Sequence, residues 1–143
     1  MKRVMIKLSI KKGIKRIDCM KKIKKEVVRD DTRKIAVKFA QMADKKKAEN
    51  IVILNVKKLT FIADAFIIAS IRNKKQGQAI ALDMIAYSKK EGITNLGLEG
   101  YEEGNWILLD FGSTVIHLFN DKLREFYNLE LLWGDATQIK WKR

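Results

Sequence analysis

The chain has 143 residues, of which 47% are hydrophobic and 33% charged, and this balance is typical of one folded domain rather than a disordered chain. It contains no uninterrupted apolar run of about 18 residues, so the sequence predicts no membrane-spanning helix. A single histidine and a single cysteine exclude an internal disulfide and any metal site that needs several His or Cys ligands.

The net charge of +13 is concentrated at the two ends of the chain. Residues 1–34 contain 14 Lys or Arg against 4 Asp or Glu, whereas residues 35–135 contain 13 of each. The last eight residues add three basic side chains and no acid. Basic ends attract a polyanion, but a neutral body is expected to recognise something other than nucleic acid.

Residues 1–31 are predicted to form a basic arm that precedes the domain. Lysines interrupt every apolar stretch that could serve as a secretory signal. The cytoplasm is the expected location, and an organelle is the alternative if residues 1–25 are a transit peptide, since they are basic and nearly free of acids. A translation start at Met20 would leave a shorter arm.

The predicted domain spans residues 32–136 and begins with an amphipathic helix behind N-cap candidates such as Thr32. The apolar residues of this helix recur at helical spacing and form one stripe: Ala36, Phe39, Ala40 and Ala43. Two short apolar runs follow and are typical of buried strands: Ile51–Val56 and Asp64–Ser70. Residues 76–90 predict a second helix, after which Gly92 stands as a C-terminal glycine. A short strand is expected at residues 95–99.

A β-hairpin is predicted around the two-residue turn Gly112-Ser113. Pairing across this turn places six residues on a face that suits the core: Ile107, Leu109, Phe111, Thr114, Ile116 and Leu118. The opposite face is less ordinary, because it mixes aromatic rings with a carboxylate and an imidazole: Trp106, Leu108, Asp110, Val115, His117 and Phe119.

Two interpretations of this second face stay open from the residues alone. In the first, another helix packs on it, and Asp110 and His117 satisfy each other across the ladder. In the second, the face is a docking patch, because protein interfaces favour aromatic anchors with a few oriented polar groups.

The last predicted helix starts at Asn120 or Asp121 and turns three apolar residues inward: Leu123, Phe126 and Tyr127. Residues 129–133 are expected to close the ordered body, and residues 137–143 form a basic tail. The elements together predict a single compact α/β domain with a mixed β-sheet flanked by helices.

The chain contains no motif that names a reaction. It has neither a G-x-S-x-G elbow nor the glycine patterns of phosphate-binding loops, and the Asp110–His117 pair has no evident nucleophile beside it. Two-metal chemistry would need a second acid two residues from Asp110, where the sequence has glycine. We therefore expect no enzyme, no cofactor and no metal.

From Ile35 to Ala136 the sequence resembles the Iojap-like ribosomal silencing factors. The resemblance depends on six segments in the same order as in the family: A-D-A-F-I-I-A-S at 63–70, Q-x-x-A-I-A at 76–81, L-E-G at 98–100, W-I-L-L-D-F-G at 106–112, V-I-H-L-F at 115–119 and R-E-F-Y-N-L-E-L-L-W-G-D-A at 124–136. It implies a fold similar to nucleotidyl transferases but without their catalytic acids.

The resemblance also implies a function without chemistry. Members of this family bind the large ribosomal subunit through its ribosomal protein fourteen and sterically block association with the small subunit, which represses translation. A nucleotide- or RNA-modifying enzyme on a nucleotidyl-transferase-like fold is the alternative. A homodimer of the free protein is a further expectation, because an apolar patch needs covering in the absence of the ribosome.

Carried onto this sequence, the family's signature predicts five partner-binding residues: Trp106, Leu108, Asp110, Phe111 and His117. Tyr127 and Trp133 are expected to support them at the rim or in the core. Arg72, Lys74 and Lys75 form a basic loop that is expected to lie near ribosomal RNA. This loop departs from the family pattern at residues 71–73, and Ser113 stands where the family commonly has Asp.

Overall fold

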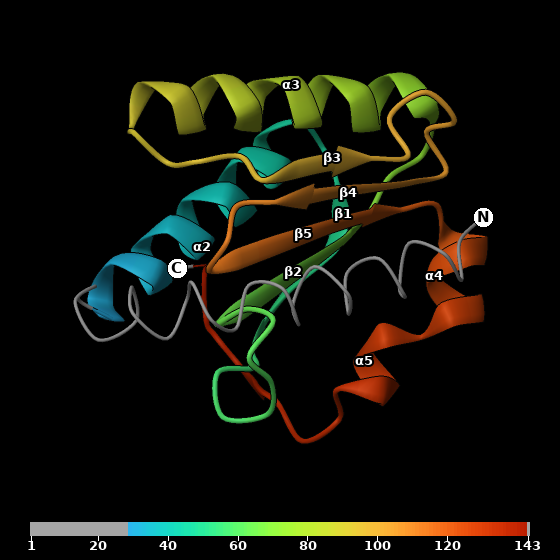
Figure 1. Ribbon diagram of the computed structural model, residues 1–143. Helices are drawn as coiled ribbons and strands as arrows, with labels where there is room; N and C mark the ends of the chain where they lie inside the picture. Colours follow the sequence, from blue (N-terminus) through green and yellow to red (C-terminus); the bar gives the residue numbers. More distant parts are fainter. Residues whose placement is uncertain (1–28, 143) are drawn as a thin grey trace.

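The computed structural model of the protein describes residues 29–142 (Figure 1). Nearly all of the predicted basic arm lies outside the described residues, as do Cys19 and the alternative start at Met20. The first described helix, α2 (Arg29–Lys45), starts three residues before the predicted domain boundary and carries the expected buried stripe, which includes Phe39 and Ala40. Among residues 29–142, none of the helices combines the length and apolar character that a membrane crossing requires.

The described residues form a six-stranded mixed sheet in the order β3-β4-β5-β2-β1-β6. The strand bounds are β1 Glu49–Asn55, β2 Ala65–Ser70, β3 Gly97–Glu99, β4 Trp106–Asp110, β5 Thr114–Phe119 and β6 Thr137–Gln138. Strands β2 and β5 run parallel, and every other neighbouring pair is antiparallel. This arrangement confirms the predicted mixed sheet and its flanking helices.

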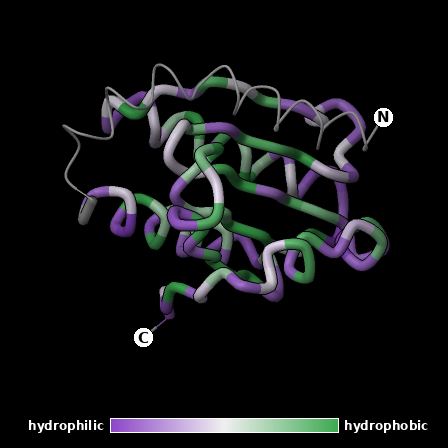
Figure 2. Tube along the Cα trace, turned by 60° about the horizontal axis from the view of Figure 1, so that its bottom comes forward, coloured by the Kyte–Doolittle hydropathy of each residue, from purple (hydrophilic) through white to green (hydrophobic). Residues whose placement is uncertain are grey.

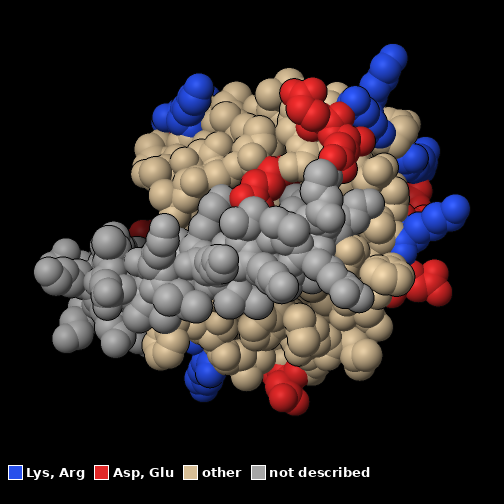
Figure 3. Space-filling model, turned by 45° about the vertical axis from the view of Figure 1, so that its right-hand side comes forward, with Lys and Arg blue, Asp and Glu red and all other residues tan. Residues whose placement is uncertain are grey.

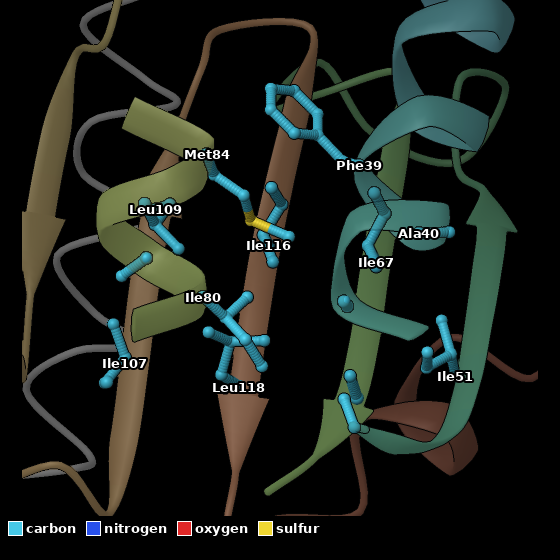
Figure 4. Close-up of a cluster of buried hydrophobic side chains, with 14 of the residues drawn as sticks. Phe39, Ala40, Ile51, Ile67, Ile80, Met84, Ile107, Leu109, Ile116 and Leu118 are labelled. Atoms are coloured by element: carbon cyan, nitrogen blue, oxygen red, sulfur yellow. The ribbon is translucent and has the colours of Figure 1, made fainter. Parts of the chain in front are cut away.

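Helices cover the sheet from both sides. On one face, α2 and α3 (Lys74–Lys90) pack side chains such as Phe39 and Met84 onto strand residues that include Ile67 and Ile116 (Figure 4). The short helices α4 (Asp121–Tyr127) and α5 (Leu129–Leu132) contribute to a second buried cluster on the other face. Figure 2 shows hydrophobic residues along the central strands and hydrophilic ones interspersed along the outer elements.

The β4–β5 hairpin has the predicted register. Trp106 pairs with Phe119, Leu108 with His117 and Asp110 with Val115. The turn is closed by the Phe111 N–H, which donates to the Thr114 carbonyl at 2.9 Å. Gly112 has φ +84°, a conformation that side-chain-bearing residues rarely adopt, so the two-residue turn depends on glycine here.

The predicted basic tail instead contributes to the sheet. Residues 137 and 138 form β6, which pairs with β1 at the sheet edge. The Ile139 N–H donates to the Ile53 carbonyl at 2.8 Å, and the Trp141 indole N–H donates to the Ile51 carbonyl at 3.0 Å. A strand of two residues has no alternating pattern to detect, so its pairing partner rather than its own sequence determines it.

Candidate docking site

The second face of the hairpin lies inside the protein. Trp106 and Leu108 are each 1% exposed, and His117 is 5% exposed. Trp106 and Leu108 belong to a cluster that also includes Phe66 of β2 and Leu129 of α5, and the His117 ring contacts Phe66 and Trp106. The structure therefore corrects the expectation that this face is an exposed docking patch and favours the alternative in which helices pack on it. The reason is the α4–α5 unit, which brings apolar side chains back onto the face that the hairpin alone would leave open.

Trp106 is the centre of this second cluster. Its ring centroid lies 4.6 Å from that of Phe119 and 4.9 Å from that of Tyr127. Its indole N–H donates to His117 Nδ1 at 3.1 Å, so the buried donor and acceptor satisfy each other. This bond takes the place of the expected Asp110–His117 pair, because Trp106 and His117 are diagonal neighbours whose long side chains meet on the same face.

His117 is neutral in the folded protein. Burial lowers its pKa from 6.5 to about 3, because the imidazolium would lose its hydration. Its Nδ1 accepts the Trp106 hydrogen bond, so the ring proton is assigned to Nε2. The Phe66 ring meets the imidazole edge-on, with centroids 5.6 Å apart. This surrounding suits a packed, uncharged ring and disfavours a proton-transfer role.

This pKa predicts that stability falls in mild acid. The unfolded chain protonates His117 below pH 6.5, whereas the folded protein does so only near pH 3. Unfolding is therefore favoured as the pH drops through this window, by about 1.4 kcal/mol per unit from this group alone. The free energy of unfolding, measured by urea titration from pH 7.5 to 5, should fall with decreasing pH in the wild type. It should fall less steeply in His117→Gln. Equal slopes would mean that His117 is accessible to protons in the fold.

Asp110 and Phe111 have separate structural roles. Asp110 is buried, and its Oδ1 accepts the Gly112 N–H at 2.9 Å, which supports the hairpin turn. Phe111 points to the opposite side of the sheet and stacks on Phe39 of α2, with ring centroids 4.7 Å apart. The structure thus separates Phe111 from Trp106, Leu108 and His117 and buries all of them, so none offers an exposed surface to a partner.

The α4–α5 unit carries three of the exposed large apolar side chains among the described residues. The unit turns at Asn128, which adopts the left-handed conformation with φ +43° and accepts the Leu131 N–H with its side chain. Phe126 is 71% exposed, Leu131 76% and Leu132 63%. The inward orientation expected for Phe126 is therefore wrong. Leu123 and Tyr127, by contrast, pack against the second cluster as expected.

A hydrogen bond and two aromatic contacts attach this unit to the sheet, and an ion pair joins its two helices. Arg124 donates from Nε to Glu130 at 2.8 Å and from a guanidinium nitrogen to the Ser70 hydroxyl at 2.9 Å. These bonds link α4, α5 and β2, so Arg124 is more than a surface charge. The half-buried Tyr127 and Trp133 rest on Trp106 and Phe66 respectively. Sequence reasoning missed the Ser70 contact, because Ser70 is 54 residues from Arg124 in the chain.

The three basic residues of the predicted RNA-proximal loop are exposed at the start of α3. Arg72 is held by Glu49, with a guanidinium nitrogen 2.7 Å from the carboxylate, so its charge is locally compensated. Lys74 and Lys75 occupy the first turn of α3. Within residues 29–142, His, Cys, Asp and Glu side chains do not gather into a group of three or more that could hold a metal ion.

Comparison with known proteins places the chain in a family. Residues 29–143 match the model of the family described as "Ribosomal silencing factor during starvation". Ribosomal silencing factors of Halalkalibacterium halodurans and Bacillus subtilis are 45% and 40% identical over 97 residues, which cover 68% of this chain and 83% and 82% of theirs. The chloroplast protein Iojap of Arabidopsis thaliana is 39% identical and aligns with 79% of this chain and 48% of its own.

Solved structures agree with this assignment. A crystal structure from Bacillus halodurans superposes with a TM-score of 0.63 at 38% identity and covers 72% of this chain and 94% of that one. One from Chromobacterium violaceum superposes with a TM-score of 0.68 at 30% identity and covers 76% and 88%. On the family match and these identities, the chain belongs to the ribosomal silencing factor during starvation family.

Proposed function

We propose that the protein is a ribosome-associated translational repressor. It binds the large ribosomal subunit through ribosomal protein fourteen and sterically blocks association with the small subunit. The observation that carries the proposal is the exposed apolar surface of Phe126, Leu131 and Leu132. It packs on a buried aromatic cluster, and the chain is a member of the silencing factor family. The function needs no chemistry, since occupancy of the subunit interface is enough to prevent joining.

The contact surface in this proposal is α4–α5, and the hairpin residues first predicted to dock act as its support. Large apolar side chains that are exposed within one short segment mark interaction sites in soluble proteins. Their foundation is rigid, because Trp106 and Phe66 fill the space beneath Tyr127 and Trp133. A preorganised surface loses little conformational freedom on binding, which strengthens the interaction.

The setting of this surface suits a protein partner. The α4–α5 unit also carries exposed charges of both signs, Asp121, Lys122 and Glu125, and outside the residues drawn in grey the face in Figure 3 shows a few acidic and basic side chains among residues of other types. An apolar patch with a charged rim is the usual anatomy of a protein–protein interface. In the free protein a second copy would cover the same patch and form a homodimer. We propose the cytoplasm as the location, because the ribosomal subunits join there.

Co-sedimentation with purified large subunits tests the function. The protein should pellet with large subunits, and its addition before small subunits should reduce the fraction of joined ribosomes. Pre-incubation with isolated ribosomal protein fourteen should compete for binding and restore joining. Absence from the pellet at low salt, where the basic ends favour association, would overturn the proposal. Binding without any loss of joined ribosomes would overturn the repressor role.

A further inference from the structure

The outward side of α2 carries a line of cations that the hairpin and α4–α5 do not use. The cations are Lys34, Lys38 and Lys45. Together with the uncharged Gln41 they follow the helical spacing i, i+4, i+7, i+11, and all four residues are exposed. The line is about 16 Å long, given a rise of 1.5 Å per residue. Charge counting had grouped Lys34 with the basic N-terminal end and had left the body neutral. The structure places Lys34 on α2 and aligns it with two lysines of the body.

This line borders a groove between α2 and α3. Two adjoining hollows of about 500 and 560 Å³ share Lys38, Gln41 and Tyr87 in their walls, so they form one continuous depression. Both helices cover the sheet face opposite the second cluster, so the groove is distant in the fold from the α4–α5 surface (Figure 1). Its remaining lining residues are Arg33, Lys34, Val37, Met42, Lys45, Lys46 and Asp83.

The charge in the groove is strongly one-sided. Asp83 is the single acid among the lining residues, and it is 3.2 Å from Lys46 Nζ, so these two compensate each other. Lys34 and Lys45 form no ion pair with any residue that the structure describes. Uncompensated cations along a concave surface focus a positive potential, which favours a polyanion over a protein partner.

We propose that the α2–α3 groove binds the sugar–phosphate backbone of RNA without reading its base sequence. Lysines along one side of a rigid helix suit the regular negative charge of a nucleic acid strand. Lys38 Nζ lies over the Tyr87 ring, 5.8 Å from its centroid, and occupies the face on which a base would stack. The phenol of Tyr87 stays protonated, since burial and Glu91 raise its pKa, and it adds one hydrogen-bond donor.

The choice of RNA among polyanions rests on the proposed function, because a ribosome-bound protein meets RNA beside its protein partner. The groove and the α4–α5 surface lie on opposite sides of the sheet. Such an arrangement would let the protein contact a ribosomal protein and an RNA strand at the same time. Two moderate contacts on one particle raise the overall affinity through effective concentration, provided that both can be engaged together.

The test measures how salt changes the affinity of the full chain for naked RNA. The probe is a short fluorescein-labelled polyuridine, titrated at salt concentrations from roughly 50 to 200 mM. The groove variant combines Lys34→Gln, Lys38→Gln and Lys45→Gln. Its matched control removes three exposed lysines outside the groove: Lys58→Gln, Lys122→Gln and Lys140→Gln. The basic ends outside residues 29–142 are the same in all variants, so their contribution cancels.

In the groove variant, the slope of log affinity against log salt concentration should become shallower by about 2. Each of the three removed lysines accounts for about 0.7, the value for one phosphate contact with a single strand. The control should keep the wild-type slope, and arginine at positions 34, 38 and 45 should restore it. An unchanged slope in the groove variant, or an equal loss in the control, would overturn the proposal. No ribosomal protein is present, so a failure of subunit docking cannot produce either result. Thermal unfolding confirms that each variant is folded.

Discussion

Alanine at position 106 is expected to lower the free energy of unfolding by about 3–5 kcal/mol, the usual cost of truncating a buried large aromatic. Trp106 is 1% exposed and contacts Phe119 and Tyr127, so its removal leaves a cavity under α4. It also leaves the buried His117 Nδ1 without its donor, which adds an unsatisfied acceptor to the loss. Urea unfolding followed by circular dichroism measures the change directly.

Trp106→Phe separates the cost of the cavity from the cost of the lost hydrogen bond to His117. Phenylalanine keeps most of the buried ring but cannot donate to His117, so this variant should lose about 1–3 kcal/mol, the cost of an unsatisfied buried acceptor. The same experiment distinguishes support from contact. A Trp106→Ala protein with wild-type stability but without affinity for large subunits would place Trp106 at the interface itself and contradict its assignment to the core.

The register of the hairpin could be predicted from the sequence because it depends on local chemistry. Gly112-Ser113 permits a two-residue turn, and once the turn is set, strict alternation assigns each side chain to a face. The burial of the second face could not be predicted in the same way. It depends on where α4 and α5 pack, which is a tertiary contact. The residue pattern of the hairpin face and that of α4–α5 are each compatible with exposure to solvent or with burial in the core.

Phe126 shows how a helical pattern can mislead over a short span. Leu123, Phe126 and Tyr127 fit one apolar stripe, yet α4 has only seven residues and ends where Asn128 turns the chain. Two of the three apolar residues are enough to pack such a helix onto the sheet, so the third remains in solvent. The hydrogen bond from Arg124 to Ser70 also depends on how α4 packs on the sheet. The sequence around either residue does not predict that contact.

The docking surface gives the second large expected effect. The double variant Phe126→Ala, Leu131→Ala should reduce affinity for large subunits about 1,000-fold, since interface anchors of this kind often contribute about 2 kcal/mol each. Both side chains are mostly exposed, so the unfolding free energy should change by no more than about 0.5 kcal/mol per substitution. Binding is measured by sedimentation with purified large subunits, and stability by urea unfolding of the free protein.

Two other exposed leucines supply a matched control. Leu82 of α3 and Leu96 before the edge strand β3 are 53% and 47% exposed and lie outside α4–α5. Leu82→Ala with Leu96→Ala removes exposed apolar surface elsewhere on the domain and should leave subunit binding unchanged. An equal loss in both pairs would show that binding follows general surface hydrophobicity rather than the α4–α5 site. A loss confined to Phe126 and Leu131 would instead define a docking surface that Trp106 and His117 support from beneath.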